Sequence, residues 1–218
     1  MVKLDIKFND EMISSIIHLV GFLFAFVGVT FLIVYASLMR DPWKIVSFSI
    51  YGFTLLLLFI ASTLYHGVNH SKTLKEKLRY LDYASISLVI AGTITPICLI
   101  LLRGFYGWTV FGLIWFFAIL GIILRIGFKA PIWITSPIYI LMGWLAILIA
   151  LPIYQLDIMA FKLLLAGGLF YTLGFIIFSA QKPTLIENKF TFHEIWHILI
   201  LLGSICHFVM IFLYLLPL

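Results

Sequence analysis

Residues 15–37 read SIIHLVGFLFAFVGVTFLIVYAS, a stretch that contains no charged side chain and decides the fold class. About 20 consecutive apolar residues are enough for an α-helix to cross the hydrocarbon core of a bilayer. This stretch therefore predicts a membrane-spanning helix. Six further apolar runs of similar length follow it, at residues 44–67, 82–102, 107–127, 132–152, 161–180 and 194–216.

The composition of the chain is typical of a polytopic membrane protein. Hydrophobic residues make up 64% of the 218 residues, charged residues make up 11%, and the mean hydropathy is +1.18. These values exclude a soluble domain, which is roughly half apolar and about a quarter charged, and they exclude a disordered chain. The apolar runs are continuous rather than alternating, which favours helices over a membrane β-barrel. We therefore predict an all-α fold in which residues 1–218 form one bundle of seven transmembrane helices.

Positive charge predicts the orientation of this bundle, because lysine and arginine are enriched in cytoplasmic loops. With a cytoplasmic N-terminus, the basic residues on the cytoplasmic side are Lys3, Lys7, Lys72, Lys75, Lys77, Arg79, Arg125, Lys129, Lys182 and Lys189. Those on the other side are Arg40, Lys44, Arg103 and Lys162. The bias favours a cytoplasmic N-terminus and an outside C-terminus, and it explains the net charge of +5 without nucleic-acid binding. The segment 72–79 is expected to be a basic loop that can also contact anionic lipid headgroups.

A few polar residues at the ends of three predicted spans indicate a site, because polar groups at membrane depth are costly. Ser62 and His66 lie at the end of the second span, and Asp82 lies at the start of the third. His193 and His197 lie at the start of the seventh, where a spacing of four places both imidazoles on one helix face. In the predicted topology all these ends lie in one layer near the cytoplasmic surface. Three imidazoles with an open coordination position form a catalytic Zn²⁺ site, beside which a carboxylate can orient water or act as a base.

The stretch 193–197 also matches the letters of the metalloprotease motif H-E-x-x-H, in which Glu194 would be the base. Taken alone this short match is weak, and two interfacial histidines explain it equally well. His18, near the start of the first span, is expected to make a structural hydrogen bond, with support of a zinc ligand as the alternative. His207 lies about 15 Å deeper than His197 at 1.5 Å per residue. It is therefore expected to hydrogen-bond to another helix or to line a cavity rather than to bind the metal.

The pattern S-x-x-x-H, then Asp, then H-x-x-x-H across three spans resembles the hemolysin III / progestin and adipoQ receptor family. That family belongs to a wider group of seven-helix membrane proteins that includes the alkaline ceramidases. Glu11, Ser15, His18 and Gly21 are similar to the E-x-x-x-S-x-x-H-x-x-G start of the bacterial branch. The stretches 81–83 and 92–96 resemble its third span, and HEIWHILILLGSICHF at 193–208 resembles its last span. The resemblance covers essentially the whole chain and implies a location in the bacterial inner membrane.

The resemblance also implies roles for individual residues. The zinc ligands would be His66, His193 and His197. Asp82 would lie beyond the ligands, hydrogen-bonded to the metal-bound water, and Ser62 would donate to a carbonyl oxygen as charge develops. The residue between the two histidines is not the base in this family, so Glu194 receives no catalytic role.

Three functions remain open from the sequence. The first is a zinc-dependent hydrolase of a membrane lipid, in which the metal lowers the pKa of its bound water toward about 7. A ceramide-like amide is the substrate that the relatives suggest, and another acyl amide or ester is the alternative in bacteria. The second is a receptor-like sensor in which zinc is structural and a lipid or partner shifts the bundle. The third is transport or cell lysis, and the oligomeric state is left open by the sequence.

Overall fold

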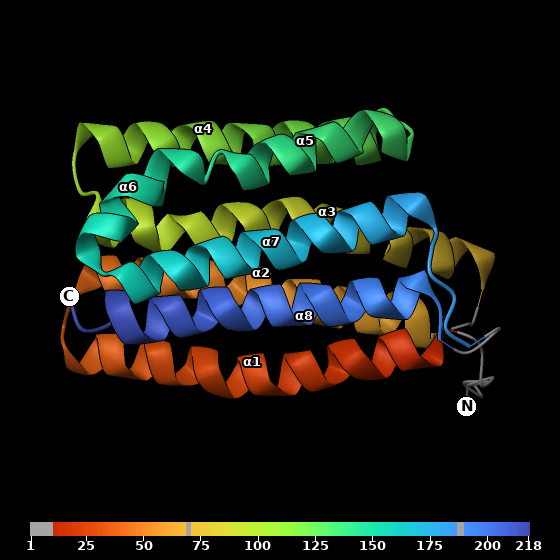
Figure 1. Cartoon of the computed structure of the whole chain (residues 1–218), viewed down its shortest axis with the longest axis horizontal. Helices are drawn as coiled ribbons and strands as arrows, with labels where there is room; N and C mark the ends of the chain where they lie inside the picture. The colour runs from red at the N-terminus through yellow and green to blue at the C-terminus, as the bar shows by residue number, and fades with distance from the viewer. Residues whose placement is uncertain (1–10, 69–70, 187–189) are drawn as a thin grey trace.

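The computed structural model describes residues 11–68, 71–186 and 190–218. Within these ranges the chain is helical and contains seven segments that are long and apolar enough to cross a membrane, which confirms the predicted fold class (Figure 1). The α-helices are α1 (Met12–Leu38), α2 (Pro42–Gly67), α3 (Lys72–Pro96), α4 (Phe105–Ile122), α5 (Ile132–Trp144), α6 (Ile147–Leu156), α7 (Ile158–Ala180) and α8 (Phe192–Met210). π-helical turns extend α3, α4 and α8; these are η1 (Ile97–Leu101), η2 (Ile123–Gly127) and η3 (Ile211–Leu215).

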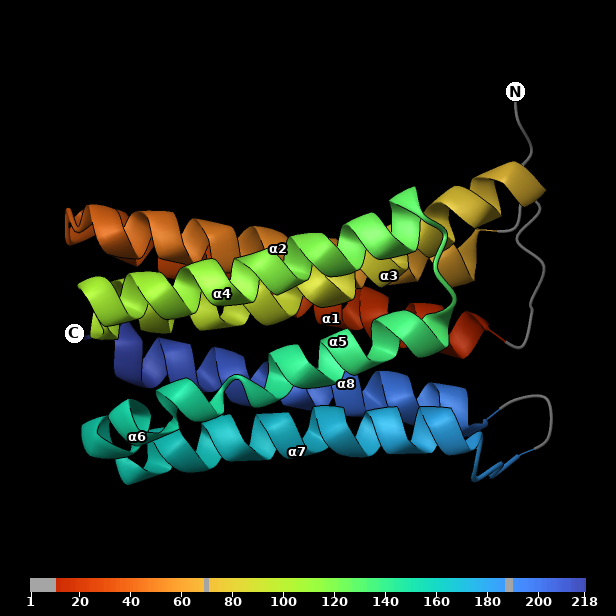
Figure 2. The ribbon, with the colours of Figure 1, turned by 90° about the horizontal axis from the view of Figure 1, so that it is seen from above.

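The helices lie side by side with their axes along the length of the molecule (Figures 1 and 2). α1 packs along α2, α2 along α3, and α7 along α8, while α8 also contacts α1. α1, α3 and α8 begin at the same end of the bundle, where α2 finishes, and we call this the site end (Figure 1). The C-terminus lies at the opposite end.

Close packing of the first three helices depends on small residues. A Cβ atom on Gly52 of α2 would lie 2.2 Å from Val29 of α1. A Cβ atom on Gly92 of α3 would lie 1.9 Å from the hydroxyl of Thr54 on α2. Glycine at these two positions therefore lets the helix backbones approach closely, as is common between helices in lipid.

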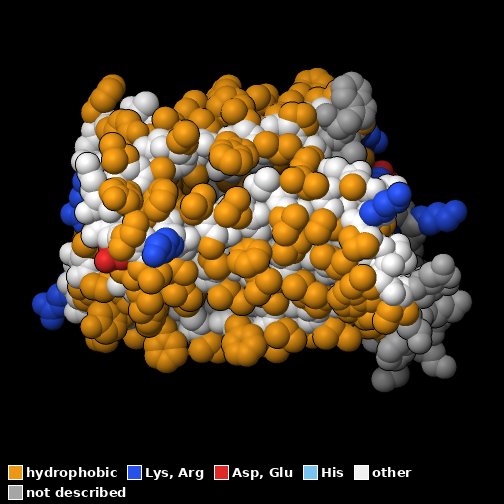
Figure 3. Space-filling view, in the orientation of Figure 1, with side chains coloured by type: hydrophobic (Ala, Val, Ile, Leu, Met, Phe, Trp, Pro, Cys, Tyr) orange, Lys and Arg blue, Asp and Glu red, His pale blue; other side chains and the backbone are white. Residues whose placement is uncertain are grey.

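The outer surface of the bundle is apolar over most of its length (Figure 3). Phe24, Phe31 and Phe53 have exposed fractions of 76%, 64% and 65%. Side chains of this kind would form a patch far larger than a soluble monomer exposes. The surface therefore requires lipid acyl chains as its surroundings.

Described basic residues are unequally divided between the two ends of the bundle. Seven lie toward the site end: Lys72, Lys75, Lys77, Arg79, Arg125, Lys129 and Lys182. Four lie toward the opposite end: Arg40, Lys44, Arg103 and Lys162. Lys3, Lys7 and Lys189, which also entered the predicted orientation, lie outside the described residues. A cytoplasmic location of the site end stays a prediction from this bias.

The prediction of a loop over residues 72–79 is wrong, because this segment forms the first turns of α3. Ser71 caps the helix by accepting a hydrogen bond from the backbone N–H of Leu74 at 3.2 Å. Lysine, glutamate, arginine and leucine are all good helix formers, so the segment continues the helix beyond its apolar part. Hydropathy marked the part of α3 that suits lipid, not the full extent of the helix.

The fifth predicted span, 132–152, is divided into α5 and α6 and reaches beyond residue 152. Pro152 lies inside α6 and has no N–H with which to bond the carbonyl group of Leu148. The Tyr106 hydroxyl of α4 donates to this carbonyl at 2.6 Å. A neighbouring helix thus satisfies the group that proline leaves free, and the chain remains helical as far as Leu156.

Candidate metal centre

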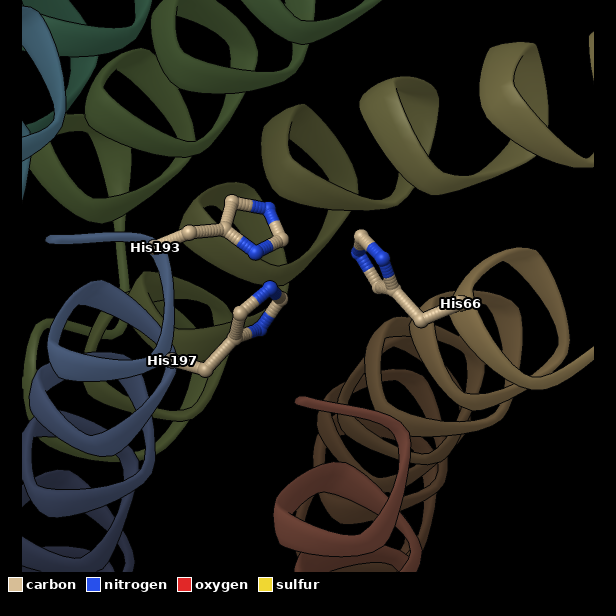
Figure 4. A group of neighbouring side chains, drawn as sticks. All are labelled: His66, His193 and His197. Atoms are coloured by element: carbon tan, nitrogen blue, oxygen red, sulfur yellow. The ribbon is translucent and has the colours of Figure 1, made fainter. Parts of the chain in front are cut away.

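The structure brings the three predicted ligands together at the site end (Figure 4). His66 lies in the last turn of α2, and His193 and His197 lie in the first turns of α8. One possible ligand atom from each residue lies within 4.8 Å of the other two. The ring centroids are 4.8 Å apart for His66 with each α8 histidine and 4.6 Å apart for the α8 pair. Within the described residues this is the group of side chains that could share one metal ion.

A capping box fixes the start of α8 and with it the position of the two histidines. The backbone N–H and the hydroxyl of Thr191 donate to Glu194 Oε2 at 2.7 and 2.8 Å. The Thr191 hydroxyl in turn accepts from the backbone N–H of His193 at 3.2 Å. Glu194 Oε1 accepts from the Ser14 hydroxyl at 3.1 Å, which joins the start of α8 to α1. Glu194 therefore has a structural role that explains its place between the histidines.

The beginning of α1 contacts the Nδ1 atom of every candidate ligand. The three contacts are Glu11 Oε2 with His66 at 3.4 Å, Ser14 Oγ with His193 at 3.3 Å, and His18 Nε2 with His197 at 2.9 Å. A histidine that binds a metal usually donates its other ring N–H to a protein group, which fixes the tautomer and the ring orientation. α1 offers no ligand itself, but it is placed to orient all three.

The remaining ring nitrogens fit a metal ion. His66 Nε2 and His197 Nε2 are buried and have no hydrogen-bond partner within the described residues. Leaving a buried polar atom unpaired costs about 1–3 kcal/mol, and coordination would remove this cost. Imidazole nitrogens are common ligands of Zn²⁺, so the chemistry of the donors fits the predicted metal.

Asp82 and Ser62 lie beside this histidine group, as the sequence predicted. Asp82 on α3 is 5% exposed and is a neighbour of both Ser62 and His66. Ser62 lies one turn before His66 on α2 and is 1% exposed. Its hydroxyl makes no hydrogen bond of normal geometry with a described residue. A buried carboxyl group and a buried hydroxyl group beside His66 provide a proton acceptor and a hydrogen-bond donor for a bound molecule.

Glu11 is held in its ionised form by a hydrogen bond with His66 and by the ammonium group of Lys75. The contact with His66 is the largest influence and, together with the Lys75 ammonium at 3.0 Å, lowers the pKa of Glu11 to about 2 despite partial burial. Lys75 also donates to the backbone carbonyl of Tyr65. At neutral pH Glu11 is thus a carboxylate that can accept the Nδ1–H of His66.

The contacts of Glu11 and Ser14 with the candidate ligands were not predicted from the sequence. Glu11, Ser14 and His18 are spaced by three and four residues, which is the spacing of one helix face. That spacing could have indicated a polar face at the start of the first span. His18 hydrogen-bonds to a candidate ligand, His197, which matches the alternative expected for it, support of a ligand, rather than the favoured structural hydrogen bond.

His207 lies apart from the metal centre, in the interior between α7 and α8. Its ring packs against Tyr171 with 5.4 Å between ring centroids. A Cβ atom on Gly167 would lie 2.6 Å from the ring, so this glycine makes room for it. His207 Nδ1 has no partner within the described residues, and the predicted hydrogen bond to another helix is absent for this atom.

The chain is similar to known proteins over nearly its whole length. Residues 6–208 match the family model described as haemolysin-III related. A protein named hemolysin-3 from Bacillus cereus is 41% identical over 212 residues, which cover 96% of this chain and 93% of that protein. A hemolysin-3 homolog from Bacillus subtilis (strain 168) is 38% identical over 209 residues, which cover 94% of each chain. Together with the seven apolar helices, these matches show that the chain is a multi-pass integral membrane protein of the haemolysin-III-related family.

Proposed function

We propose that this protein is a zinc-dependent hydrolase of a lipid amide or ester in the bacterial cell membrane. The observation that carries the proposal is the three-histidine group with Asp82 and Ser62 beside it. A structural zinc site usually has four protein ligands, whereas a catalytic site has three and an open position. Within the described residues the group holds three candidate ligands, and the acidic neighbour is available for proton transfer.

Each polar residue has a distinct role in this proposal. The zinc ion, when bound by the three histidines, would supply Lewis acidity for a water molecule and a substrate carbonyl group. Asp82 would orient the attacking water and accept its proton. Ser62 would donate a hydrogen bond to the carbonyl oxygen as negative charge develops there. Glu11, Ser14 and His18 would hold the imidazole rings in place through their Nδ1 atoms.

The position of the centre supports a lipid as the substrate. The histidines lie at the end of the bundle, in the last turn of α2 and the first turns of α8. The apolar surface of the bundle extends from that end along the helices (Figure 3). A lipid therefore has its amide or ester linkage near the level of the metal and its acyl chains beside the apolar helices.

The test is a hydrolysis screen with purified, zinc-loaded protein and acyl amides and acyl esters of membrane lipids. We expect turnover by the wild type and a loss of about 10²–10⁴-fold in Asp82→Asn, which removes the proton acceptor. Zinc content and melting temperature of Asp82→Asn should equal those of the wild type, because Asp82 is not a ligand in this proposal. Equal turnover in Asp82→Asn and the wild type would contradict the mechanism.

A structural role of the metal in a sensor is the second candidate. It is favoured by the position of the ligands, since a metal ion would join α2 to α8, two helices that are not a closely packed pair. In this case His66→Ala lowers the melting temperature, and the zinc-loaded wild type hydrolyses no lipid in the screen. Lipid turnover by the zinc-loaded wild type therefore distinguishes the hydrolase from the sensor.

Lysis and transport form the third candidate, because the relatives are named hemolysins and the buried His207 lies beside Tyr171 deeper in the bundle. The interior is filled with fully buried side chains such as Phe48, Ile97 and Met210, which argues against a wide pore. Transport would produce ion or solute flux in vesicles that depends on His207. Release of a trapped dye from vesicles would support lysis instead of hydrolysis.

A further inference from the structure

Two arginines at the site end have no acidic partner among the residues that the structure describes. Arg79 lies in α3 and Arg125 lies in η2. The ion pairs formed by described residues involve other cations, namely Lys75, Arg103 and two histidines. The Nε atoms of both arginines are buried and lack a hydrogen-bond partner in the described part of the chain. A buried guanidinium nitrogen without a partner is costly, and an anionic ligand would supply the acceptor.

Arg125 is held in a fixed position by its surroundings. Its guanidinium carbon lies 4.3 Å from the centre of the Tyr83 ring. One of its terminal nitrogens donates to the backbone carbonyl of Ala130 at 2.7 Å. The Tyr139 hydroxyl of α5 donates to the backbone carbonyl of Tyr83 at 3.4 Å. Stacking on an aromatic ring leaves the edge of a guanidinium free to bind a planar or tetrahedral anion.

Arg79 lies on the same face of α3 as Tyr83, the ring on which Arg125 stacks. It precedes Tyr83 by four residues and Asp82 by three, so all three lie on one face of the helix. Its guanidinium carbon lies 5.6 Å from the ring centre of Tyr80. Three residues of helix rise about 4.5 Å, which places Arg79 closer to the end of the bundle than Asp82 by one turn.

From this arrangement we propose that Arg79 and Arg125 bind the anionic headgroup of the lipid that reaches the metal centre. The ligand chemistry is a phosphate or carboxylate group, which guanidinium groups bind with two parallel hydrogen bonds. The headgroup would lie at the membrane surface, and the acyl linkage would lie one helical turn deeper, at the level of Asp82. A neutral ceramide would leave both arginines unpaired, so the inferred substrate is an acidic acyl lipid. The substrate part of this inference rests on the proposed hydrolase function.

Two lysines at the site end, Lys75 and Lys77, differ from the two arginines in their surroundings. Lys77 is exposed on α3 and, within the described residues, has neither an aromatic nor an acidic partner. Lys75 is paired with Glu11. An exposed lysine attracts anionic lipid only through general electrostatics, which salt weakens. Lys77→Gln is thus a matched control that removes the same charge from the same helix.

The experiment measures lipid binding directly, by native mass spectrometry of the purified full chain in detergent. The probes are phosphatidylglycerol, phosphatidylcholine with the same acyl chains, and inorganic phosphate. We expect the wild type to prefer phosphatidylglycerol to phosphatidylcholine and Arg79→Gln/Arg125→Gln to bind phosphatidylglycerol at least about tenfold more weakly. Lys77→Gln should bind like the wild type. Arg125→Lys, which keeps the charge and loses the fork, should also bind more weakly, and melting temperatures check that each variant is folded.

The outcomes distinguish a lipid headgroup from free phosphate as the bound anion. They also distinguish the headgroup site from the proposed hydrolase function. Binding of phosphatidylglycerol without binding of inorganic phosphate supports a lipid headgroup site, whereas equal binding of phosphate replaces the lipid with a free anion. Equal phosphatidylglycerol binding by the double variant and the wild type overturns the site. The same binding measurement on His193→Ala, which lacks one metal ligand, distinguishes failure of the headgroup site from failure of the hydrolase proposal. Arginine-dependent binding that survives in this variant supports the headgroup site even if the hydrolase proposal fails.

Discussion

At the scale of single residues, the centre is defined by what each imidazole nitrogen contacts. The Nδ1 atoms of the three candidate ligands contact α1 or its cap, while His66 Nε2 and His197 Nε2 are buried without a described partner. If His197 binds the metal through Nε2, its Nδ1–H donates to His18 Nε2. In this arrangement His197 carries its proton on Nδ1, and His18, which accepts through Nε2, carries its proton on Nδ1.

His18→Ala removes the acceptor for His197 and leaves all three ligands in place. We expect this variant to bind zinc about 10–100-fold more weakly than the wild type, because loss of an outer partner loosens the ligand ring. Competition with a chromophoric chelator measures the affinity. His207→Ala is the control, since it removes another buried imidazole away from the metal centre. An unchanged affinity in His18→Ala would show that α1 does not orient the ligand.

The sequence indicated some members of the centre and not others, for a physical reason. His66, Asp82 and the α8 pair stand out because they are ionisable residues at the ends of apolar runs. The partnership of Glu11 with His66 depends on how α1 packs against the end of α2, which no local pattern contains. Tertiary contacts of this kind appear only when the helices are assembled.

At the scale of helices, the starts of α2 and α8 are fixed by side-chain caps. Thr191 and Glu194 form the box at α8, and Asp41 accepts from the backbone N–H groups of Trp43 and Lys44 at α2. Each cap satisfies N–H groups that have no partner within the helix. The caps therefore determine where two of the functional helices begin.

Glu194→Ala tests whether this carboxylate is structural or catalytic. The variant loses the capping box, so we expect a destabilisation of about 1 kcal/mol and a lower melting temperature. Glu194→Gln keeps an acceptor at the cap and should retain most of the stability and the full zinc content. If Glu194→Gln folds, binds zinc and yet hydrolyses no lipid, Glu194 is a catalytic base and its role here is wrong.

Asp41 predicts a pH dependence that is independent of the metal. Burial raises the pKa of Asp41, but the N–H groups of Lys44 and Trp43 and the Arg103 guanidinium outweigh it and lower the pKa below its usual value of 3.8. The stabilisation is thus present above pH 3.8 and is lost as the pH falls through the lower folded pKa. Asp41→Asn should be about 0.5 kcal/mol less stable at neutral pH, with the difference vanishing in acid. Thermal unfolding over a pH series measures this, and a constant difference would contradict it.

At the scale of the whole molecule, hydropathy alone predicted the seven spans because lipid requires continuous apolar helices. It failed at the start of α3, where helix continues into the basic segment, and at the division of α5 from α6. Hydropathy predicts which residues suit lipid, but it does not predict where a helix begins or where it is interrupted. The predicted orientation is checked by a reporter fused to the C-terminus, which we expect to be active outside the cytoplasm.

We infer above all that α2 and α8 together hold one metal ion. The most direct measurement is the zinc content of detergent-purified protein by elemental analysis, with the wild type beside His193→Ala and with His207→Ala as control. We expect one zinc ion for each chain in the wild type and in His207→Ala, and its loss in His193→Ala. A wild type that contains no metal even after zinc is supplied would show that the three histidines are a polar network rather than a metal centre.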